Sequence, residues 1–170
     1  RPSLIDHPLT SSDDFPHSTS DPSFLGPKAH ASNVNDRLLV SWPEIRLGLG
    51  SGELALRLID VRSPMEFRLG SIPDARNIPL LEDHERHQVG LTYRNEGKTA
   101  AVTLGLDLFA NKAANYLELL RRHLSHGTGL VVYCWRGGMR SRSVATYLRS
   151  LGFRCQVLEG GYKGYRRLVL

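Results

Sequence analysis

Short apolar runs alternate with amphipathic stretches from about residue 37 onward, a pattern that predicts strands separated by helices. We predict five strands, at residues 38–41, 54–61, 75–78, 129–133 and 153–158. Apolar residues at helical spacing predict helices at residues 42–47, 64–69, 99–109, 112–124 and 141–151. The glycines at positions 48, 50 and 52 are expected to end the first helix. Because several strands are almost wholly apolar, we expect an α/β domain with a mostly parallel, about five-stranded sheet flanked by helices.

Residues 1–36 differ in texture from the rest of the chain. They are rich in Ser, Pro and Asp, show little apolar periodicity, and contain several X-Pro steps that disfavour helix. We expect a flexible leader here, with an irregular arm packing through Phe15, Phe24 and Leu25 as the alternative. A single domain is then expected over residues 37–170.

The composition narrows the class of protein. Of 170 residues, 41% are hydrophobic and 23% charged, which is ordinary globular usage and excludes collagen-like, coiled-coil and wholly disordered chains. No apolar run approaches the roughly 18 residues of a membrane span, and no secretory signal opens the sequence. Two cysteines are too few for a disulfide scaffold, so we expect a soluble protein in the reducing cytoplasm.

Positive charge gathers toward the end of the sequence. The whole chain carries a net +5, but residues 121–170 contain ten Lys and Arg against one acidic residue, Glu159. A field of that strength attracts phosphate, nucleic acid or another anion, although a solvated basic surface would look the same in sequence.

One segment carries the candidate chemistry. Directly after the apolar strand 129–133 come the residues Cys134, Trp135, Arg136, Gly137, Gly138, Met139, Arg140 and Ser141. In a parallel sheet this is the edge where ligands bind, and inward-pointing loop amides before a helix N-terminus favour an anion. The C-x5-R spacing lets Arg140 close a ring of donors around an oxyanion.

The donors and positive charge of this loop are also expected to make Cys134 a nucleophile. An ordinary thiol, with a pKa near 8.5, is only about 3% thiolate at pH 7, and charge-assisted hydrogen bonds lower that pKa. The alternative is a buried cysteine that acts as a small hydrophobe. We expect that structural role for Cys155, which lies near the start of its strand. Asp60 and Arg62 are expected to support the site, paired with each other or with the loop arginines.

Three segments resemble a known family. Residues 60–67 (DVRSPMEF) with 70–79 (GSIPDARNIP) look like the first signature of rhodanese domains, and residues 152–161 (GFRCQVLEGG) resemble the second. A narrower similarity is to the rhodanese domain of the tRNA 2-selenouridine synthase family. It rests on an insertion that ordinary rhodaneses lack, beginning ERHQVGLTY at residue 85, on CWRGGMRS at 134–141 and on EGGYK at 159–163.

This resemblance implies a function. It implies replacement of sulfur by selenium at the wobble 2-thiouridine of tRNA, with selenophosphate as donor, an S-geranylated intermediate and no bound cofactor. Cys134 matches the family's essential cysteine. The oxyanion would be held by Arg136, Arg140 and the loop amides, with support from Asp60, Arg62 and Glu159. The basic residues of the segment 121–170 would face tRNA. Family members continue into a C-terminal P-loop domain that we do not find, so we expect a fragment, a shortened relative or a half whose partner chain supplies it.

Other functions remain compatible with the same residues. A stand-alone sulfurtransferase could use thiosulfate or a persulfide, although ordinary rhodanese loops look one residue shorter. The C-x5-R spacing also resembles cysteine phosphatases and arsenate reductases, which usually need a carboxylic general acid. A binding module that keeps only the scaffold is the non-enzymatic alternative.

Two weaker motifs are expected to carry no chemistry. Residues 96–99 (EGKT) resemble half a Walker motif, but Thr92 stands where its first glycine belongs. Two HxxH pairs, His84 with His87 and His123 with His126, lack further ligands at suitable spacing, so we predict no metal site.

Overall fold

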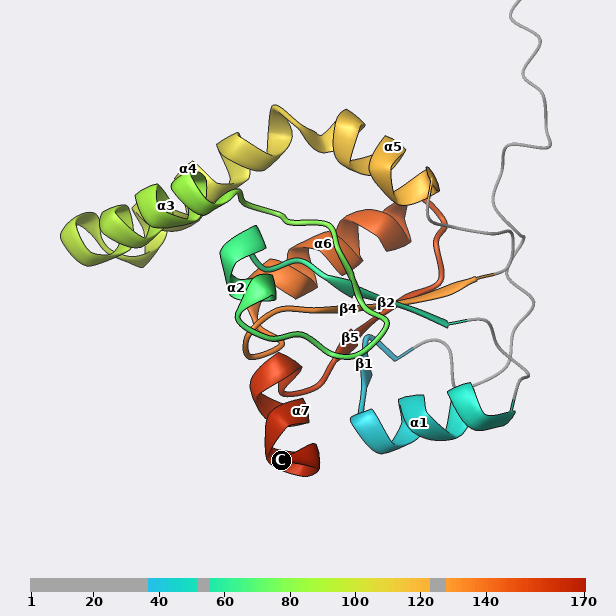
Figure 1. The fold of residues 1–170 in the computed structure, drawn as a ribbon. Helices are drawn as coiled ribbons and strands as arrows, with labels where there is room; N and C mark the ends of the chain where they lie inside the picture. Colours follow the sequence, from blue (N-terminus) through green and yellow to red (C-terminus); the bar gives the residue numbers. More distant parts are fainter. Residues whose placement is uncertain (1–36, 52–55, 123–127) are drawn as a thin grey trace, which may run out of the picture.

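The computed structural model describes residues 37–51, 56–122 and 128–170 (Figure 1). Its strands are β1 (Leu39–Val40), β2 (Leu56–Asp60), β3 (Arg76–Asn77), β4 (Gly129–Tyr133) and β5 (Cys155–Leu158). They form one sheet in the order β1-β5-β4-β2-β3, and every neighbouring pair is parallel. The predicted α/β class and five-stranded sheet are confirmed. The predicted leader lies outside the described residues.

Helices cover both faces of the sheet. They are α1 (Trp42–Ser51), α2 (Pro64–Arg68), α3 (Asp83–Glu96), α4 (Lys98–Ala110), α5 (Ala113–Arg122), α6 (Met139–Ser150) and α7 (Gly161–Val169). Helices α1 and α7 lie on one face, and α5 and α6 lie on the other (Figure 1). Side chains of β4 alternate between the two resulting cores, because successive residues of a strand point to opposite faces. Val132 joins the α5–α6 core, while Val131 and Tyr133 join the α1–α7 core.

Of the three glycines predicted to end the first helix, Gly48 and Gly50 lie inside it, and Gly52 lies outside the described residues. Helix α1 continues through Gly48 and Gly50 to Ser51. A glycine inside a helix costs only about 1 kcal/mol, which the buried Ile45 on the same helix offsets by packing in the core. At Gly48, a β-carbon would stand 3.5 Å from the Leu56 side chain, an ordinary contact, so the position is close to β2 but not strained.

Helix α3 was not predicted, because its sequence has no continuous apolar stripe. Its first turn is instead closed by a capping box, in which the Glu82 amide donates to the Glu85 carboxylate at 2.7 Å. Lys112, just before α5, forms an ion pair with Glu85. Helix α3 is thus stabilised by polar contacts at its first turn and by packing against α4, without an apolar stripe of its own.

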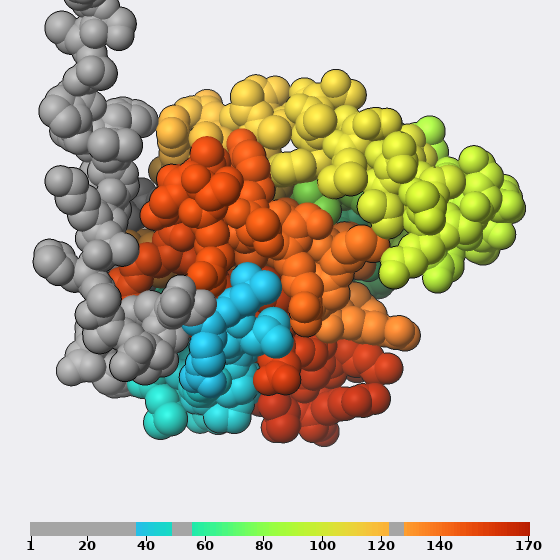
Figure 2. All heavy atoms as spheres, turned by 180° about the vertical axis from the view of Figure 1, so that it is seen from behind, coloured from blue at the N-terminus to red at the C-terminus, as the bar shows by residue number. Residues whose placement is uncertain are grey.

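Helices α3 and α4 form a hairpin that projects from the body of the domain (Figure 2). It contains the segment that the sequence marked as an insertion. Gly97 joins the two helices with a φ of 92°, a left-handed value that favours glycine. A phosphate loop follows a strand, whereas Gly97 follows a helix, so the Walker-like residues 96–99 lack the required setting. Within the described ranges, no helix is both long and apolar enough to cross a membrane.

Candidate active site

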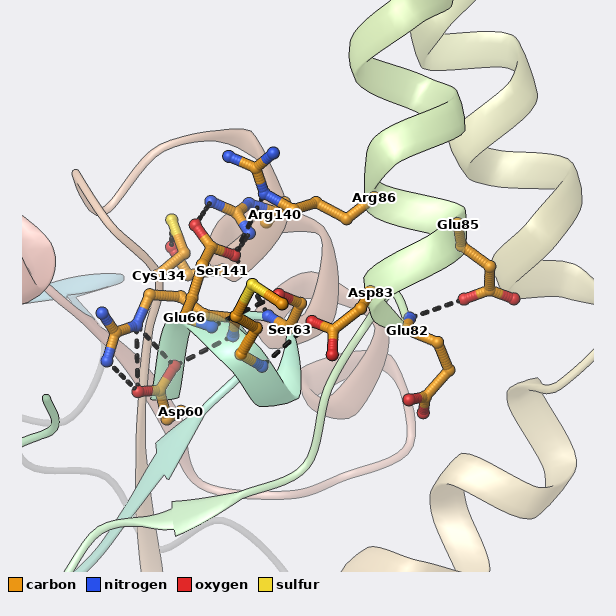
Figure 3. A network of polar contacts seen from close by, with 12 residues as sticks. Asp60, Ser63, Glu66, Glu82, Asp83, Glu85, Arg86, Cys134, Arg140 and Ser141 are labelled. Carbon is orange, nitrogen blue, oxygen red and sulfur yellow. Dashed lines mark hydrogen bonds and ion pairs between the residues drawn. The ribbon is translucent and has the colours of Figure 1, made fainter. Parts of the chain in front are cut away.

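Cys134 lies where the middle strand of the sheet ends. Strand β4 leads into the cysteine loop, residues 134–141, which passes into the first turn of α6. The thiol is buried, and its sulfur lies 3.3 Å from the Ser141 hydroxyl oxygen (Figure 3). Parallel strands present their carboxyl ends at this edge of the sheet, as the sequence predicted for a ligand site.

The electrostatics of the loop favour the thiolate. Burial raises the pKa of Cys134, but hydrogen bonds from the Ser141 hydroxyl and amide, the charge of Arg140 and the Arg136 amide together lower it below its ordinary value. Two backbone amides therefore point at the sulfur, as expected for a loop that stabilises an anion. The partial positive charge of the α6 N-terminus acts in the same direction.

The loop is held against the turn that follows β5. The amide of Tyr162 donates to the Cys134 carbonyl at 2.9 Å, and the amide of Lys163 donates to the Trp135 carbonyl at 2.9 Å. Gly161 has a φ of 58°, and a β-carbon there would lie 2.3 Å from the Cys134 carbonyl oxygen. This close approach is the physical reason for a glycine at the end of the second signature.

Arg140 forms an ion pair with a carboxylate of α2. Its guanidinium donates to both oxygens of Glu66, at 2.7 and 3.2 Å, and Arg86 of α3 lies 3.4 Å from the same carboxylate (Figure 3). Burial raises the pKa of Glu66, but the hydrogen bond and charge of Arg140, the Ser63 amide and the charge of Arg86 together lower it. That Arg140 closes a ring around a bound oxyanion stays a prediction.

Asp60 and Arg62 pair with each other rather than with the loop arginines. Both side chains are buried, and an Arg62 nitrogen lies 2.6 Å from the Asp60 carboxylate. The Arg62 guanidinium also lies 4.1 Å from the ring centroid of Tyr162 and donates to the Gly70 carbonyl at 2.7 Å. The pair thus supports α7, and through α7 the cysteine loop. Glu159, at the end of β5, has an exposed side chain, and its amide donates to the Val40 carbonyl.

Sequence reasoning missed Glu66 and Arg86 as parts of the site. The spacing of Ser63 and Glu66 does predict a capping box, and the structure contains that box at the start of α2, but this local signal does not indicate the contact with Arg140. Arg86 carries no signal, since nothing in its local pattern places α3 beside the loop.

The histidines do not form a metal centre in the described part of the chain, where no three His, Cys, Asp or Glu side chains gather. His84 and His87 are exposed residues of α3. The other pair, His123 and His126, lies outside the described residues.

The fold and the loop together define a class, an α/β domain whose central strand delivers a cysteine into an anion-stabilising loop. The chain belongs to the rhodanese family: the model described as "Rhodanese-like domain" matches residues 42–168. The resemblance seen in the sequence is thereby confirmed.

Within this family, the chain is similar to proteins that carry a specific name. The tRNA 2-selenouridine synthase of Psychromonas ingrahamii is 41% identical over 113 residues, and that of Chromohalobacter salexigens is 41% identical over 117. Each match covers 66% of this chain and 31% of the relative, so the chain spans about a third of these proteins. The chain is also similar to a solved structure, the N-terminal domain of a putative ATP/GTP binding protein from Clostridium difficile 630. The two sequences are 34% identical and the two structures superpose with a TM-score of 0.67, over 78% of this chain and 98% of that one.

Proposed function

We propose that this chain is the sulfur- and selenium-transferring domain of a tRNA 2-selenouridine synthase, with Cys134 as the residue that carries the chalcogen. In this proposal the complete protein replaces sulfur by selenium at the wobble 2-thiouridine of tRNA, with selenophosphate as donor. The observation that carries it is the position of Cys134, a buried thiol at the end of β4 whose sulfur lies 3.3 Å from the Ser141 hydroxyl of its own loop. The relatives supply the choice of substrate, because both bear that name.

The geometry suits formation of a persulfide. With thiosulfate as donor, the Cys134 thiolate attacks the outer sulfur, the S–S bond breaks, and sulfite leaves with the electron pair. The product, a persulfide anion on Cys134, carries its charge one atom further from the strand. The amides of Arg136 and Ser141, which stabilise the thiolate, are placed to stabilise this anion as well.

Two arginines are suited to the donor's oxyanion. Arg136 belongs to the loop itself, and Arg140 is partly buried at its end. Arg140 would exchange its contact with Glu66 for the donor, and Arg86 would remain as a partner of that carboxylate. This exchange would let Arg140 turn from Glu66 to an incoming anion while Glu66 keeps a cationic partner.

The phosphatase alternative is weakened by the state of Glu66. A cysteine phosphatase needs a protonated carboxylic acid near its leaving group. Glu66 contacts Arg140 of the loop, but its lowered pKa keeps it ionised at neutral pH. Asp60 is engaged with Arg62 in a buried ion pair.

The wider setting is proposed from the same relatives. Because the chain spans about a third of their length, we propose that a C-terminal P-loop domain or a partner chain completes the enzyme, and that tRNA is its macromolecular partner. Both cysteines are free, in keeping with a reducing compartment, and we propose the cytoplasm.

Intact-mass analysis tests the proposal. The purified chain is incubated with selenophosphate or with thiosulfate, and the Cys134→Ser variant serves as control. We expect the mass of one added sulfur from thiosulfate, with sulfite released, or of one added selenium from selenophosphate, with the P–Se bond broken and phosphite released, and neither addition in the variant. Addition from thiosulfate alone would favour the plain sulfurtransferase, and addition that persists in the variant would refute Cys134 as carrier.

A further inference from the structure

A cavity of about 310 Å³ lies directly beside the cysteine loop. It is lined by Trp135 of the loop and by Lys163, Arg166 and Arg167 of α7, with Leu170 at its end. Trp135 immediately follows the nucleophile, and its carbonyl accepts the Lys163 amide at 2.9 Å. The cavity and the thiol are therefore fixed to one another by the backbone of the same loop. We call it the basic cavity.

Among the residues that the structure describes, the cations of the basic cavity have no acidic partner. Within the described residues, Lys163, Arg166 and Arg167 take part in no ion pair, whereas Arg62 and Arg140 nearby are each paired with a carboxylate. Arg166 and Arg167 are exposed, and Lys163 is partly buried. Three uncompensated positive charges around one hollow favour an anionic ligand.

The aromatic residue of the basic cavity is a tryptophan, not the tyrosines interleaved with the cations. Tyr162 is buried under Arg62, and the Tyr165 ring packs edge-on against Trp42 with centroids 4.7 Å apart. The two tyrosines thus belong to the packing of α7. Trp135 is only partly buried and lines the hollow, where a flat ligand can stack on it.

We propose that the basic cavity binds one nucleotide of single-stranded RNA that neighbours the reacting nucleotide, with its base on Trp135 and its phosphates on Lys163, Arg166 and Arg167. The volume lies at the lower end of the range for small-molecule sites and suits a single nucleotide. A bare phosphate would use the cations but not the indole. The proposal rests on the proposed function for RNA as the substrate polymer, and it adds where and how the strand is held.

Charge-matched double variants test the phosphate contacts. Arg166→Gln with Arg167→Gln changes the basic cavity, and Arg57→Gln with Arg154→Gln removes the same charge from two exposed arginines near the opposite edge of the sheet. Binding of a labelled octauridylate is followed by fluorescence anisotropy. We expect at least a tenfold loss for the cavity variant, with a salt slope smaller by about 1.4, and less than a threefold loss for the control. Equal losses would overturn the proposal.

Trp135 fluorescence tests the base contact. The chain has two tryptophans, so Trp42→Phe leaves Trp135 as the only indole. We expect octauridylate to quench this emission, and an inorganic polyphosphate of similar charge to bind without quenching. Stacking of about 1–3 kcal/mol corresponds to a roughly 5- to 140-fold weaker binding of an oligonucleotide that is abasic throughout. Equal affinity for octauridylate and the abasic oligonucleotide would refute the base contact. So would a failure of octauridylate to quench the Trp135 emission.

The sulfur loading of Cys134 separates this proposal from the proposed function. The cavity variant, whose changed side chains are exposed, is expected to load sulfur from thiosulfate as the unmodified chain does. Oligonucleotide binding without any loading would contradict the proposed function alone. If Cys134 loads sulfur but the cavity variant binds the oligonucleotide as tightly as the unmodified chain, only the proposal for the basic cavity is contradicted.

Discussion

The two cysteines have the same exposure and opposite chemistry. Cys134 and Cys155 are each 4% exposed, yet the pKa of Cys134 is lowered while burial raises that of Cys155 to about 12. Cys155 begins β5 in the strand ladder, whereas Cys134 follows β4 and faces the amides of a turning loop. Burial alone makes a thiol inert, and the donors aimed at the sulfur make it reactive.

The largest expected effect is a difference in alkylation rate between the two thiols. At pH 7 a thiol with a pKa of about 12 is roughly one part in 10⁵ thiolate, and the greater nucleophilicity of a basic thiolate recovers only part of that deficit. We expect iodoacetamide to modify Cys134 at least about a hundredfold faster, as measured by peptide mass mapping. The fast phase should vanish in Cys134→Ser and persist in Cys155→Ser. Comparable alkylation rates of Cys134 and Cys155 in the unmodified chain would contradict the difference in their pKa values.

Removing the Ser141 hydroxyl is expected to make Cys134 more like Cys155. Ser141→Ala deletes the hydroxyl 3.3 Å from the sulfur but keeps the backbone amide. The pKa of Cys134 should rise, with about tenfold less thiolate at pH 7, because a hydrogen bond to the charged form is lost. The pH profile of alkylation measures this change. Ser150→Ala, at the other end of α6, is the matched control and should leave the profile unchanged.

Removing the Arg140 charge is expected to have a smaller effect in the same direction. Glu66 already offsets part of that charge, so Arg140→Ala should raise the pKa of Cys134 and cut the thiolate by roughly three- to fivefold. Arg140→Lys keeps the charge and should restore most of the thiolate. An alkylation profile that is identical in all three proteins would show that Arg140 does not act on the sulfur.

The remaining prediction concerns stability rather than reactivity. The pKa of Glu66 is lowered in the folded protein, so its ion pairs contribute stability above the ordinary value of 4.5, and this contribution is lost as pH falls through the folded pKa. Glu66→Gln should lower the free energy of unfolding by about 1–2 kcal/mol at pH 7, and by less at pH 3. Urea unfolding at both pH values measures the difference. A loss that does not vary with pH would mean that Glu66 acts through packing alone.

The sequence predicted best where local pattern and burial agree. Strand 129–133 was predicted with its observed bounds, because a short apolar run that leads straight into a cysteine and a glycine-bearing loop is typical of a central parallel strand. Helix α3 escaped prediction because tertiary contacts, not a stripe of its own, hold it. The pairing of Arg140 with Glu66 joins residues 74 positions apart, and no local signal encodes such a contact. The loop was therefore predictable as a segment, and its partners were not.

The contact between the cysteine loop and α7 sets the order in which the site can form. The carbonyls of Cys134 and Trp135 accept hydrogen bonds from amides 28 residues further along the chain. During synthesis from the N-terminus, the loop emerges before the turn at Gly160 and Gly161 that receives it. The donors that lower the pKa of Cys134 thus belong to the loop itself, whereas the contact that holds the loop in place forms only when α7 is available.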